Sequence, residues 1–420
     1  MAFFSAMPAA AASAAPTYVD QRVSAIPVAT LLARRGSGLV DPRRQLVAAH
    51  LRSYTGPLFF FWAFSQIGAF FYLWSSGNGA RLRDTMRRLV RPVFAMRCAF
   101  GAALVLIAAL AALPASLARY RVDFSFGITT EPFLAWVRHG LVATALDAVV
   151  LGLIVAAVFA LVDRTRLWYL WAMAGLSAVT LAMAFLEPVV VAPLYNHFAP
   201  LGPESPVRAP LHALAERAGI GDAPILVTDD SRRTSAAIAD VAGFGPTKRI
   251  VLSDALLENA TTGEVLFLSA REFGHYAHAD GFRLSLFWTF LLMLCTALAV
   301  VIADRVGFRR DDDPLARLSI VFAVLGILGL LATPIYNSYS RNLESRADAY
   351  ALALTGDRSA AVRAYVRLTD ETLAPLCPSR ITRIYFYNSP PLGTRIARAA
   401  GKTDPCRSKN LAAPGRERRP

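Results

Sequence analysis

Three residues near the middle of the chain, Arg271, Glu272 and His275, have the spacing of a metal-binding helix without its full set of ligands. The zinc-binding pattern H-E-x-x-H places two His on one helix face, and the Glu between them acts as general base. Glu272 and His275 supply the base and the second His. The first His is replaced by Arg271, whose guanidinium stays protonated and cannot bind a metal. The function that the sequence predicts depends on this substitution.

A second pair of residues with chemical potential follows later in the chain. Glu344 and Asp348 are four positions apart, and a helix places such residues on one face. This spacing predicts a second site helix, on which Glu344 is a further metal ligand and Asp348 orients its neighbours. His278 follows His275 by three positions. It is either a substitute ligand beside His275 and Glu344 or a partly exposed helix residue without a ligand role.

The helix that carries the first group has a clear start signal. Thr261 and Glu264 form the S/T-x-x-E capping box, and apolar residues then recur at helical spacing. The stretch before this helix is polar and turn-rich. It predicts a water-accessible domain with short elements: a helix around Pro210–Ala218 and strands at Ile225–Thr228 and Arg249–Leu252.

Composition places the rest of the chain in a membrane. Of the 420 residues 55% are hydrophobic, and the mean hydropathy of +0.42 is too high for an ordinary soluble protein. Six apolar runs are predicted to span the bilayer: Pro57–Trp74, Phe94–Leu117, Leu141–Val162, Trp168–Leu186, Leu286–Ala303 and Leu318–Tyr336. The sixth run continues without a helix breaker into Glu344 and Asp348, so the second site helix is predicted to extend it.

The net charge of +14 comes mainly from arginines in short loops that flank the apolar runs. Membrane orientation and anionic lipid account for such a distribution, so membrane lipid is the expected partner and nucleic acid is not. Both sides of the first span are basic, which leaves the orientation open. The four cysteines show no paired spacing, so neither a disulfide framework nor a cysteine metal site is predicted: Cys98, Cys295, Cys377 and Cys406.

These signals predict a mainly α, polytopic helical membrane protein with six regions. In chain order they are an N-terminal interfacial segment (1–56), a membrane domain with about four spans (57–192), a water-accessible domain with the metal-type helix (193–283), two further spans with the second site helix (284–348), a C-terminal helical part (349–401) and a disordered tail (402–420).

Several motifs in a fixed order carry a family resemblance. They are Pro193–Leu201, Ser231–Ser235 with Gly243–Leu257, Glu272–His275, Ser340–Asp348 and Asn388–Arg395. With these motifs the chain resembles the type I CAAX prenyl proteases and their bacterial relatives, which are integral-membrane zinc endopeptidases. The resemblance implies a gluzincin-like metallopeptidase domain with a small β-sheet, and location in a membrane, expected to be a bacterial plasma membrane.

The resemblance also implies a role for each matching residue. His275 and Glu344 would bind one zinc ion, and Glu272 would be the general base for water attack on a peptide bond. Asp348 would be a supporting carboxylate of the catalytic site. Arg395 would be a polar group near the substrate.

Three positions depart from the family pattern, and all three would contact metal or substrate. The first is Arg271. The second is the strand that pairs with substrate, where the family usually has Asn-Ala-Tyr and this chain has Ile238, Ala239 and an Asp. The third is Ser389, which stands where the family has a His before two prolines.

Two functions remain open on the sequence alone. One is a membrane-embedded homologue with impaired or lost catalysis that still binds a membrane-associated or lipidated peptide. The other is an active zinc endopeptidase that uses His278 or another replacement ligand. In the first case Arg271 is expected to pair with Glu344 or Asp348, because carboxylates without a metal need another cation. Metal content would distinguish the two.

Overall fold

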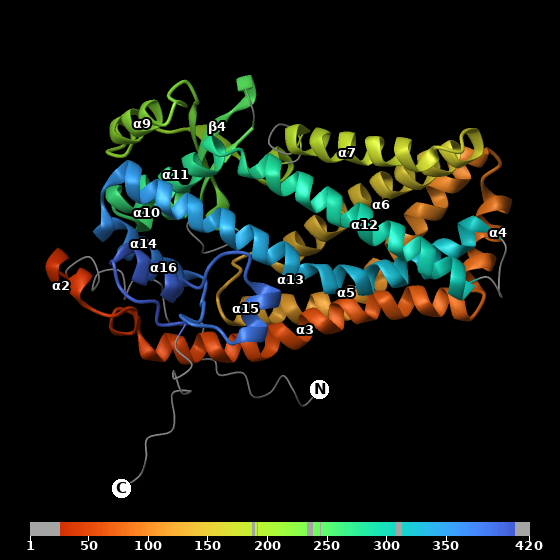
Figure 1. Ribbon diagram of the computed structural model, residues 1–420, viewed down its shortest axis with the longest axis horizontal. Helices are drawn as coiled ribbons and strands as arrows, with labels where there is room; N and C mark the ends of the chain where they lie inside the picture. Colours follow the sequence, from red (N-terminus) through yellow and green to blue (C-terminus); the bar gives the residue numbers. More distant parts are fainter. Residues whose placement is uncertain are drawn as a thin grey trace, which may run out of the picture.

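The computed structural model of the protein describes residues 26–186, 190, 192–232, 238–243, 245–307 and 313–407. Long helices run side by side through most of the molecule, and a smaller mixed α/β part lies at one end of them (Figure 1). Residues 1–25 of the predicted N-terminal interfacial segment and most of the predicted tail lie outside the described residues.

Helices dominate the chain, and the order of elements is as follows. The membrane-type part contains α2 (Val28–Ala33), α3 (Pro42–Ser75), α4 (Asn78–Leu89), α5 (Val93–Ser125), α6 (Phe133–Arg164), α7 (Trp168–Leu186) and α8 (Ala192–Tyr195). The mixed part contains β1 (Phe198–Pro200), α9 (Arg208–Arg217), β2 (Ile225–Thr228), β3 (Ala239–Ala242), β4 (Arg249–Ser253), α10 (Asp254–Asn259) and α11 (Thr262–Ala277). The remaining helices are α12 (Asp280–Gly307), α13 (Pro314–Thr355), α14 (Arg358–Glu371), α15 (Arg380–Phe386) and α16 (Leu392–Ala399).

Five helices are long and apolar enough to cross a membrane: α3, α5, α6, α12 and α13. Each contains one of the predicted spans. The remaining predicted span forms helix α7, but its apolar described stretch, Trp168–Val179, is shorter than a spanning helix. Small residues let α5 and α6 approach closely, since a side chain on Gly101 would come within 2.9 Å of the Gly152 backbone.

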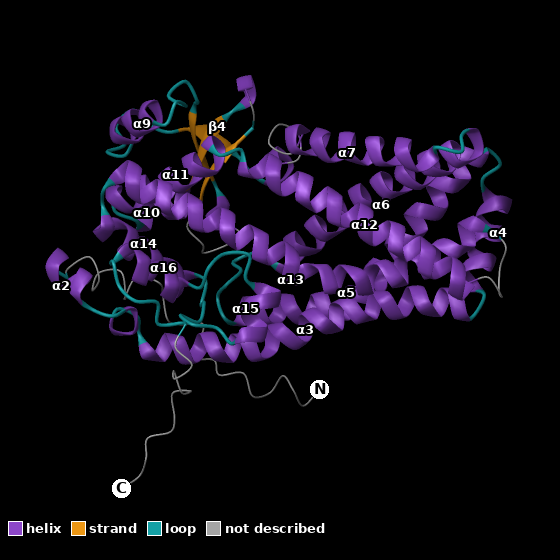
Figure 2. Cartoon of the chain, viewed as in Figure 1, coloured by secondary structure: helices purple, strands orange, loops and turns teal. Residues whose placement is uncertain are grey.

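Four strands form the small sheet in the order β1-β2-β4-β3 (Figure 2). The pairs β1–β2 and β3–β4 are antiparallel, and β2 and β4 run parallel. The predicted strands at β2 and β4 are confirmed, as is the helix at α9. The order leaves β3 at an edge of the sheet, where it packs beside the site helix α11.

Helix α11 is held in place at its start and along its buried face. The capping box of Thr261 and Glu264 is confirmed. The Glu264 carboxylate also accepts hydrogen bonds from Arg367 on α14, at 3.0 Å and 3.2 Å, and both side chains are buried. Phe267 on α11 meets Tyr365 on α14 edge-on within the same core. These contacts hold helix α11 against α14 independently of the candidate functional residues on α11.

Several sequence-based boundaries differ from the structure. Helix α3 begins at Pro42, so the predicted start at Pro57 falls inside it, and the boundaries after residues 283 and 348 fall inside α12 and α13. Residues 120–140 are divided between the end of α5, a connecting loop and the start of α6. Pro57 does not end helix α3, because proline lacks only one backbone N–H and so removes a single hydrogen bond from a long helix.

The predictions for the cysteines and the tail were wrong. Cys377 and Cys406 form a disulfide, although their separation of 29 residues gave no sign of it. Residues 402–407 are ordered, because Cys406 is bonded to the loop before α15 and the Lys402 ammonium donates to the Arg34 carbonyl. The hydrophobic core and this bond together enclose α16.

Candidate functional site

The candidate site lies where α11 packs along α13. Arg271, Glu272 and His275 come from α11, and Glu344 and Asp348 come from α13. The two helices approach closely at Gly274, where an added side chain would lie within 3.0 Å of the Tyr350 ring. Helical spacing on both elements therefore turns the predicted residues towards one another.

Arg271 is the centre of this group. Its guanidinium donates hydrogen bonds to Glu344 Oε2 at 2.5 Å, to Asp348 Oδ1 at 3.1 Å and to Glu272 Oε1 at 3.3 Å. The Arg271 side chain is 12% exposed. The expectation that Arg271 pairs with Glu344 or Asp348 is confirmed, and it pairs with both. The predicted convergence of the two site helices is confirmed by the same bonds.

Asp348 is shared between two arginines. Arg395 on α16 donates to Asp348 Oδ2 at 2.9 Å and to Oδ1 at 2.5 Å, while Arg271 bonds Oδ1. The Arg395 guanidinium lies over the Tyr365 ring at 4.4 Å from its centroid and is 3.7 Å from Glu344. Since Arg395 is only 5% exposed, its role in this structure is to hold Asp348. That Arg395 is a polar group near the substrate stays a prediction.

His275 has partners on both ring nitrogens. Its Nδ1 lies 3.0 Å from Asp280 Oδ2, and its Nε2 lies 3.4 Å from Glu344 Oε1. Asp280 is buried and also accepts a hydrogen bond of 2.5 Å from Arg346. A carboxylate on Nδ1 fixes the orientation of the ring and directs Nε2 at the site. Asp280 is thus the positioning residue for His275.

The charges of the site shift the pKa values of the α11 residues. Burial acts to lower the pKa of Arg271, but Glu272, Glu344 and Asp348 outweigh it and raise that pKa. Burial also raises the pKa of the Glu272 carboxyl, and the Arg271 charge only partly offsets this. For His275, burial lowers the pKa, but the bond to Glu344 and the charge of Glu272 raise it overall. A charged His275 would donate to two carboxylates.

The edge strand β3 lies beside α11 and offers backbone groups to a ligand. The Ile238 N–H donates a hydrogen bond to the Ser253 hydroxyl oxygen at 2.9 Å. The Ile238 carbonyl accepts one from the Ser253 backbone N–H, also at 2.9 Å. In an antiparallel ladder the next residue points its backbone groups the other way. Ala239 and Val241 therefore direct their backbone groups away from β4, at the edge of β3 that pairs with no described strand, and the Val241 N–H there also bonds the Asp240 carboxylate. The Ile238 side chain is 39% exposed.

Two predicted residues are not brought into the site. His278 caps α11, its ring nitrogen Nδ1 contacts the Gly274 carbonyl at 2.7 Å, and its ring meets Tyr350 edge-on. It therefore does not join His275 and Glu344 as a ligand. The Ser389 hydroxyl contacts Asn388 at 3.5 Å and bonds no described residue of the Arg271 group.

Sequence reasoning missed three contributors: Asp280, Arg346 and Tyr365. Asp280 lies past the end of α11, where the helical spacing used to find the site no longer applies. Arg346 lies between Glu344 and Asp348. The spacing of those two carboxylates indicated a site, but no sequence pattern singled out Arg346. Tyr365 comes from α14, whose position relative to α16 is a property of the fold.

The residues present do not fit a zinc ion. A catalytic site needs three protein ligands and one open position. Here the donors are His275 and Glu344, which contact each other, and a permanent cation is bonded to Glu344 where a third ligand would be needed. Among the described residues no group of three His, Cys, Asp or Glu is arranged to hold a metal ion. The orienting pair of Asp280 and His275 is nevertheless retained.

The bundle of apolar helices, the small mixed sheet and two site helices at its edge define an integral-membrane metallopeptidase architecture. Residues 203–403 match the model for peptidase family M48, and residues 47–197 match the model described as "CAAX prenyl protease N-terminal, five membrane helices". The chain belongs to the M48 peptidase family, in the branch with a CAAX prenyl protease N-terminal membrane domain, and is a multi-pass integral membrane protein.

Individual relatives agree with this assignment. The chain is 27% identical over 371 residues to "Uncharacterized metalloprotease YhfN" of Bacillus subtilis, covering 86% of this chain and 87% of that one. It is 28% identical over 312 residues to a CAAX prenyl protease 1 homolog of Oryza sativa, covering 71% and 72%. The crystal structure of S. mikatae Ste24p shares the fold with a TM-score of 0.73 at 22% identity, covering 93% of this chain and 97% of that one.

Proposed function

We propose that this protein binds a membrane-associated peptide in the manner of its peptidase family without hydrolysing it. One observation carries this proposal: the Arg271 guanidinium is bonded to Glu344, Asp348 and Glu272 together. Those carboxylates include the ligand and the base that metal-assisted hydrolysis would need. The same bonds keep α11 and α13 in contact, so the site architecture is preserved without a metal.

Loss of catalysis follows from the state of each group. Glu344 is bonded to Arg271, and His275 Nε2 contacts Glu344. Neither side chain therefore presents an unoccupied ligand atom to a metal ion. The Glu272 carboxyl, which would have to accept a proton, contacts Arg271 at 3.3 Å. The active alternative named His278 or another replacement ligand, and Nδ1 of His278 is engaged with the Gly274 carbonyl.

Peptide binding is supported by the free edge of β3. An extended peptide can add to an exposed sheet edge through main-chain hydrogen bonds, and the neighbouring side chains supply specificity. Ala239 and Val241 offer such groups, and Ile238 adds an exposed apolar side chain. A peptide held at a membrane by an apolar segment or a lipid would reach this edge from the bundle. The expected membrane is a bacterial plasma membrane.

Zinc content tests the first half of the proposal. The purified full-length protein is dialysed against zinc, passed through a desalting column and measured by elemental analysis. We expect the wild type to retain little zinc and Arg271→His to approach one zinc per chain, since that change completes three ligands. The matched control is Arg283→His at an exposed position. About one tightly held zinc in the wild type would overturn the proposal.

Peptide affinity tests the second half. A lipidated fluorescent peptide is titrated against the protein in nanodiscs, and Ala239→Pro is compared with the wild type. The proline removes an N–H from the free edge and leaves the bonds of Ile238 to Ser253 intact. We expect affinity to fall about threefold to tenfold, since one hydrogen bond contributes roughly 0.5–1.5 kcal/mol. Glu258→Ala, exposed on α10, is the control, and equal affinities in all three proteins would contradict edge binding.

A further inference from the structure

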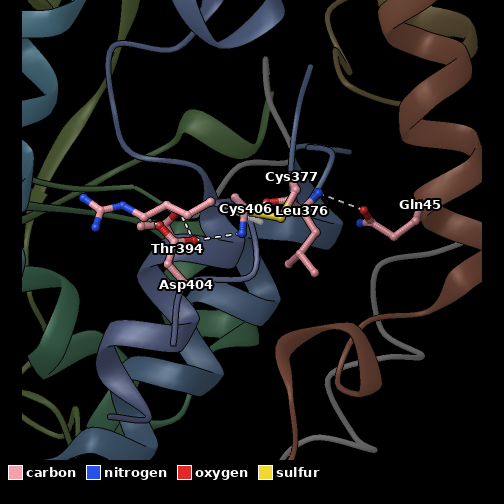
Figure 3. Close-up of a disulfide and its surroundings, with 7 residues drawn as sticks. Gln45, Leu376, Cys377, Thr394, Asp404 and Cys406 are labelled. Carbon is pink, nitrogen blue, oxygen red and sulfur yellow. Dashed lines mark hydrogen bonds and ion pairs between the residues drawn. A yellow bond between two sulfur atoms is a disulfide. The ribbon is translucent and has the colours of Figure 1, made fainter. Parts of the chain in front are cut away.

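The Cys377–Cys406 disulfide joins the C-terminal segment to the peptidase-like end of the molecule (Figure 3). Leu376, next to the bond, donates its N–H to Gln45 on α3 at 2.8 Å and accepts from the Gly393 N–H at 2.9 Å. Asp404 accepts from Thr394 on α16 at 2.9 Å. The disulfide is thus part of the same packed unit as the helix that carries Arg395.

This disulfide is informative about compartment. Both cysteines are partly exposed, so cytosolic thiols would have access to the bond. Stable disulfides are typical of oxidising compartments and rare in the cytosol. The bond forms when the two thiols give up two protons and two electrons to the disulfide of a strongly oxidising thiol–disulfide oxidoreductase, of the kind that keeps the bacterial periplasm oxidising. The peptidase-like end therefore has the chemistry of a non-cytoplasmic domain.

The charges at the far end of the bundle point to the same orientation. The connections α3–α5 and α6–α7, together with the last turn of α12 and the first turn of α13, lie at the end remote from the sheet (Figure 1). The described residues within or directly beside these short connections include eight arginines: Arg81, Arg83, Arg87, Arg88, Arg91, Arg164, Arg166 and Arg305. At the sheet end, the connection between the spanning helices α5 and α6, residues 126–132, contains no Lys or Arg, and the nearest arginines in the flanking helices are Arg121 and Arg138. Short loops rich in Lys and Arg are cytoplasmic.

The arginines near the start of α3 do not oppose this reading. In the sequence, these arginines make both ends of the first span basic, so the charge pattern alone does not give the orientation. In the structure Arg44 donates to the Asp370 carbonyl at 2.6 Å, and the Arg52 guanidinium lies 5.5 Å from the centre of the Tyr387 ring. The first turns of α3 therefore pack on the peptidase-like domain, and their charges serve that contact.

We infer that the peptidase-like domain with its Arg271 site lies on the oxidising, non-cytoplasmic side of the membrane. The arginine-rich end, defined by the eight residues above, faces the cytoplasm and the anionic headgroups of that leaflet. Arginine side chains at this level attract acidic lipid, each contributing about 1 kcal/mol. This orientation is independent of whether the site hydrolyses or only binds a peptide.

Cysteine accessibility in a Gram-negative bacterial host tests the orientation. In a Cys98→Ser, Cys295→Ser background, which leaves the disulfide intact, one reporter is placed at each end. Ala213→Cys lies exposed on α9, and Ser76→Cys lies exposed after α3. We expect a membrane-impermeant maleimide to label Ala213→Cys fully in intact spheroplasts and Ser76→Cys only after permeabilisation. The reverse pattern, or equal labelling at both ends, would overturn the inference.

The redox state of the disulfide is measured in the same cells. The background protein without a reporter is quenched with acid, and free thiols are then tagged with a heavy maleimide. We expect no tag in the normal host and two tags in a host that lacks its periplasmic thiol oxidase. Two tags in the normal host would show a reduced pair and overturn the inference, whatever the outcome of the zinc and peptide assays.

Discussion

The stability of Arg271→Ala is the sharpest test of the role assigned to this residue. The change removes three hydrogen bonds to carboxylates and leaves those carboxylates partly buried. Losing one partner of a buried ion pair costs about 3–5 kcal/mol. Arg395 still holds Asp348, and His275 still contacts Glu344, so the lower end of this range applies. We expect a loss of about 3 kcal/mol.

The measurement is thermal unfolding of the full-length protein in detergent or nanodiscs. A unit of about 200 residues changes its Tm by roughly 2–4 °C per kcal/mol, so Arg271→Ala should lower the Tm by about 6–12 °C. The control is Arg283→Ala, which removes an exposed arginine near the start of α12 and should leave the Tm unchanged. If Arg271→Ala unfolds at the same temperature as Arg283→Ala, the reasoning fails.

A double-mutant cycle separates pairing from general destabilisation. Glu344→Ala alone also breaks the bond to Arg271, so the double variant should lose less than the sum of the two single losses. Residues in direct contact give coupling energies of about 0.5–3 kcal/mol. Strictly additive losses would show that the contact between Arg271 and Glu344 contributes nothing, even if each variant is less stable.

Two further predictions concern the surroundings of the site. Gly243→Ala should destabilise the protein by at least about 1–2 kcal/mol, because Gly243 has φ +85° and an added Cβ would lie 2.3 Å from the Thr247 carbonyl oxygen; an unchanged Tm would contradict the turn geometry before β4. Cys377→Ser should lower stability by about 3–4 kcal/mol for a loop of 29 residues. Reductant should lower the wild-type Tm equally, and a variant as stable as the oxidised wild type would refute this.

The sequence predicted the parts of the fold that depend on local pattern. Apolar length identified five spanning helices, and the capping box at Thr261 identified the start of α11. Helical spacing also identified Glu344 and Asp348 as one face of α13. These predictions are correct because each feature is determined by residues that lie within a few helical turns of one another.

The parts that could not be predicted depend on contacts between distant segments. Cys377 and Cys406 meet because α16 folds between them, and no spacing rule encodes that path. Arg395 was assigned to substrate because its sequence neighbours match a substrate-binding segment, yet burial against Tyr365 directs it at Asp348. The inferred membrane orientation depends on which end of the bundle the described arginines lie at, and the sequence alone does not give that.

Under the proposed function, an arginine at position 271, and not an apolar residue, has a physical reason. Glu272, Glu344 and Asp348 come from two packed helices and would repel one another if all were charged and no cation lay between them. An apolar residue at position 271 would leave them buried without a partner, which is the costly case. A guanidinium supplies the positive charge and several donors in one plane, so it satisfies all three carboxylates at 2.5–3.3 Å. Arg271 can therefore hold the contact between α11 and α13, and with it the edge of β3, without a metal ion, as the proposed function requires.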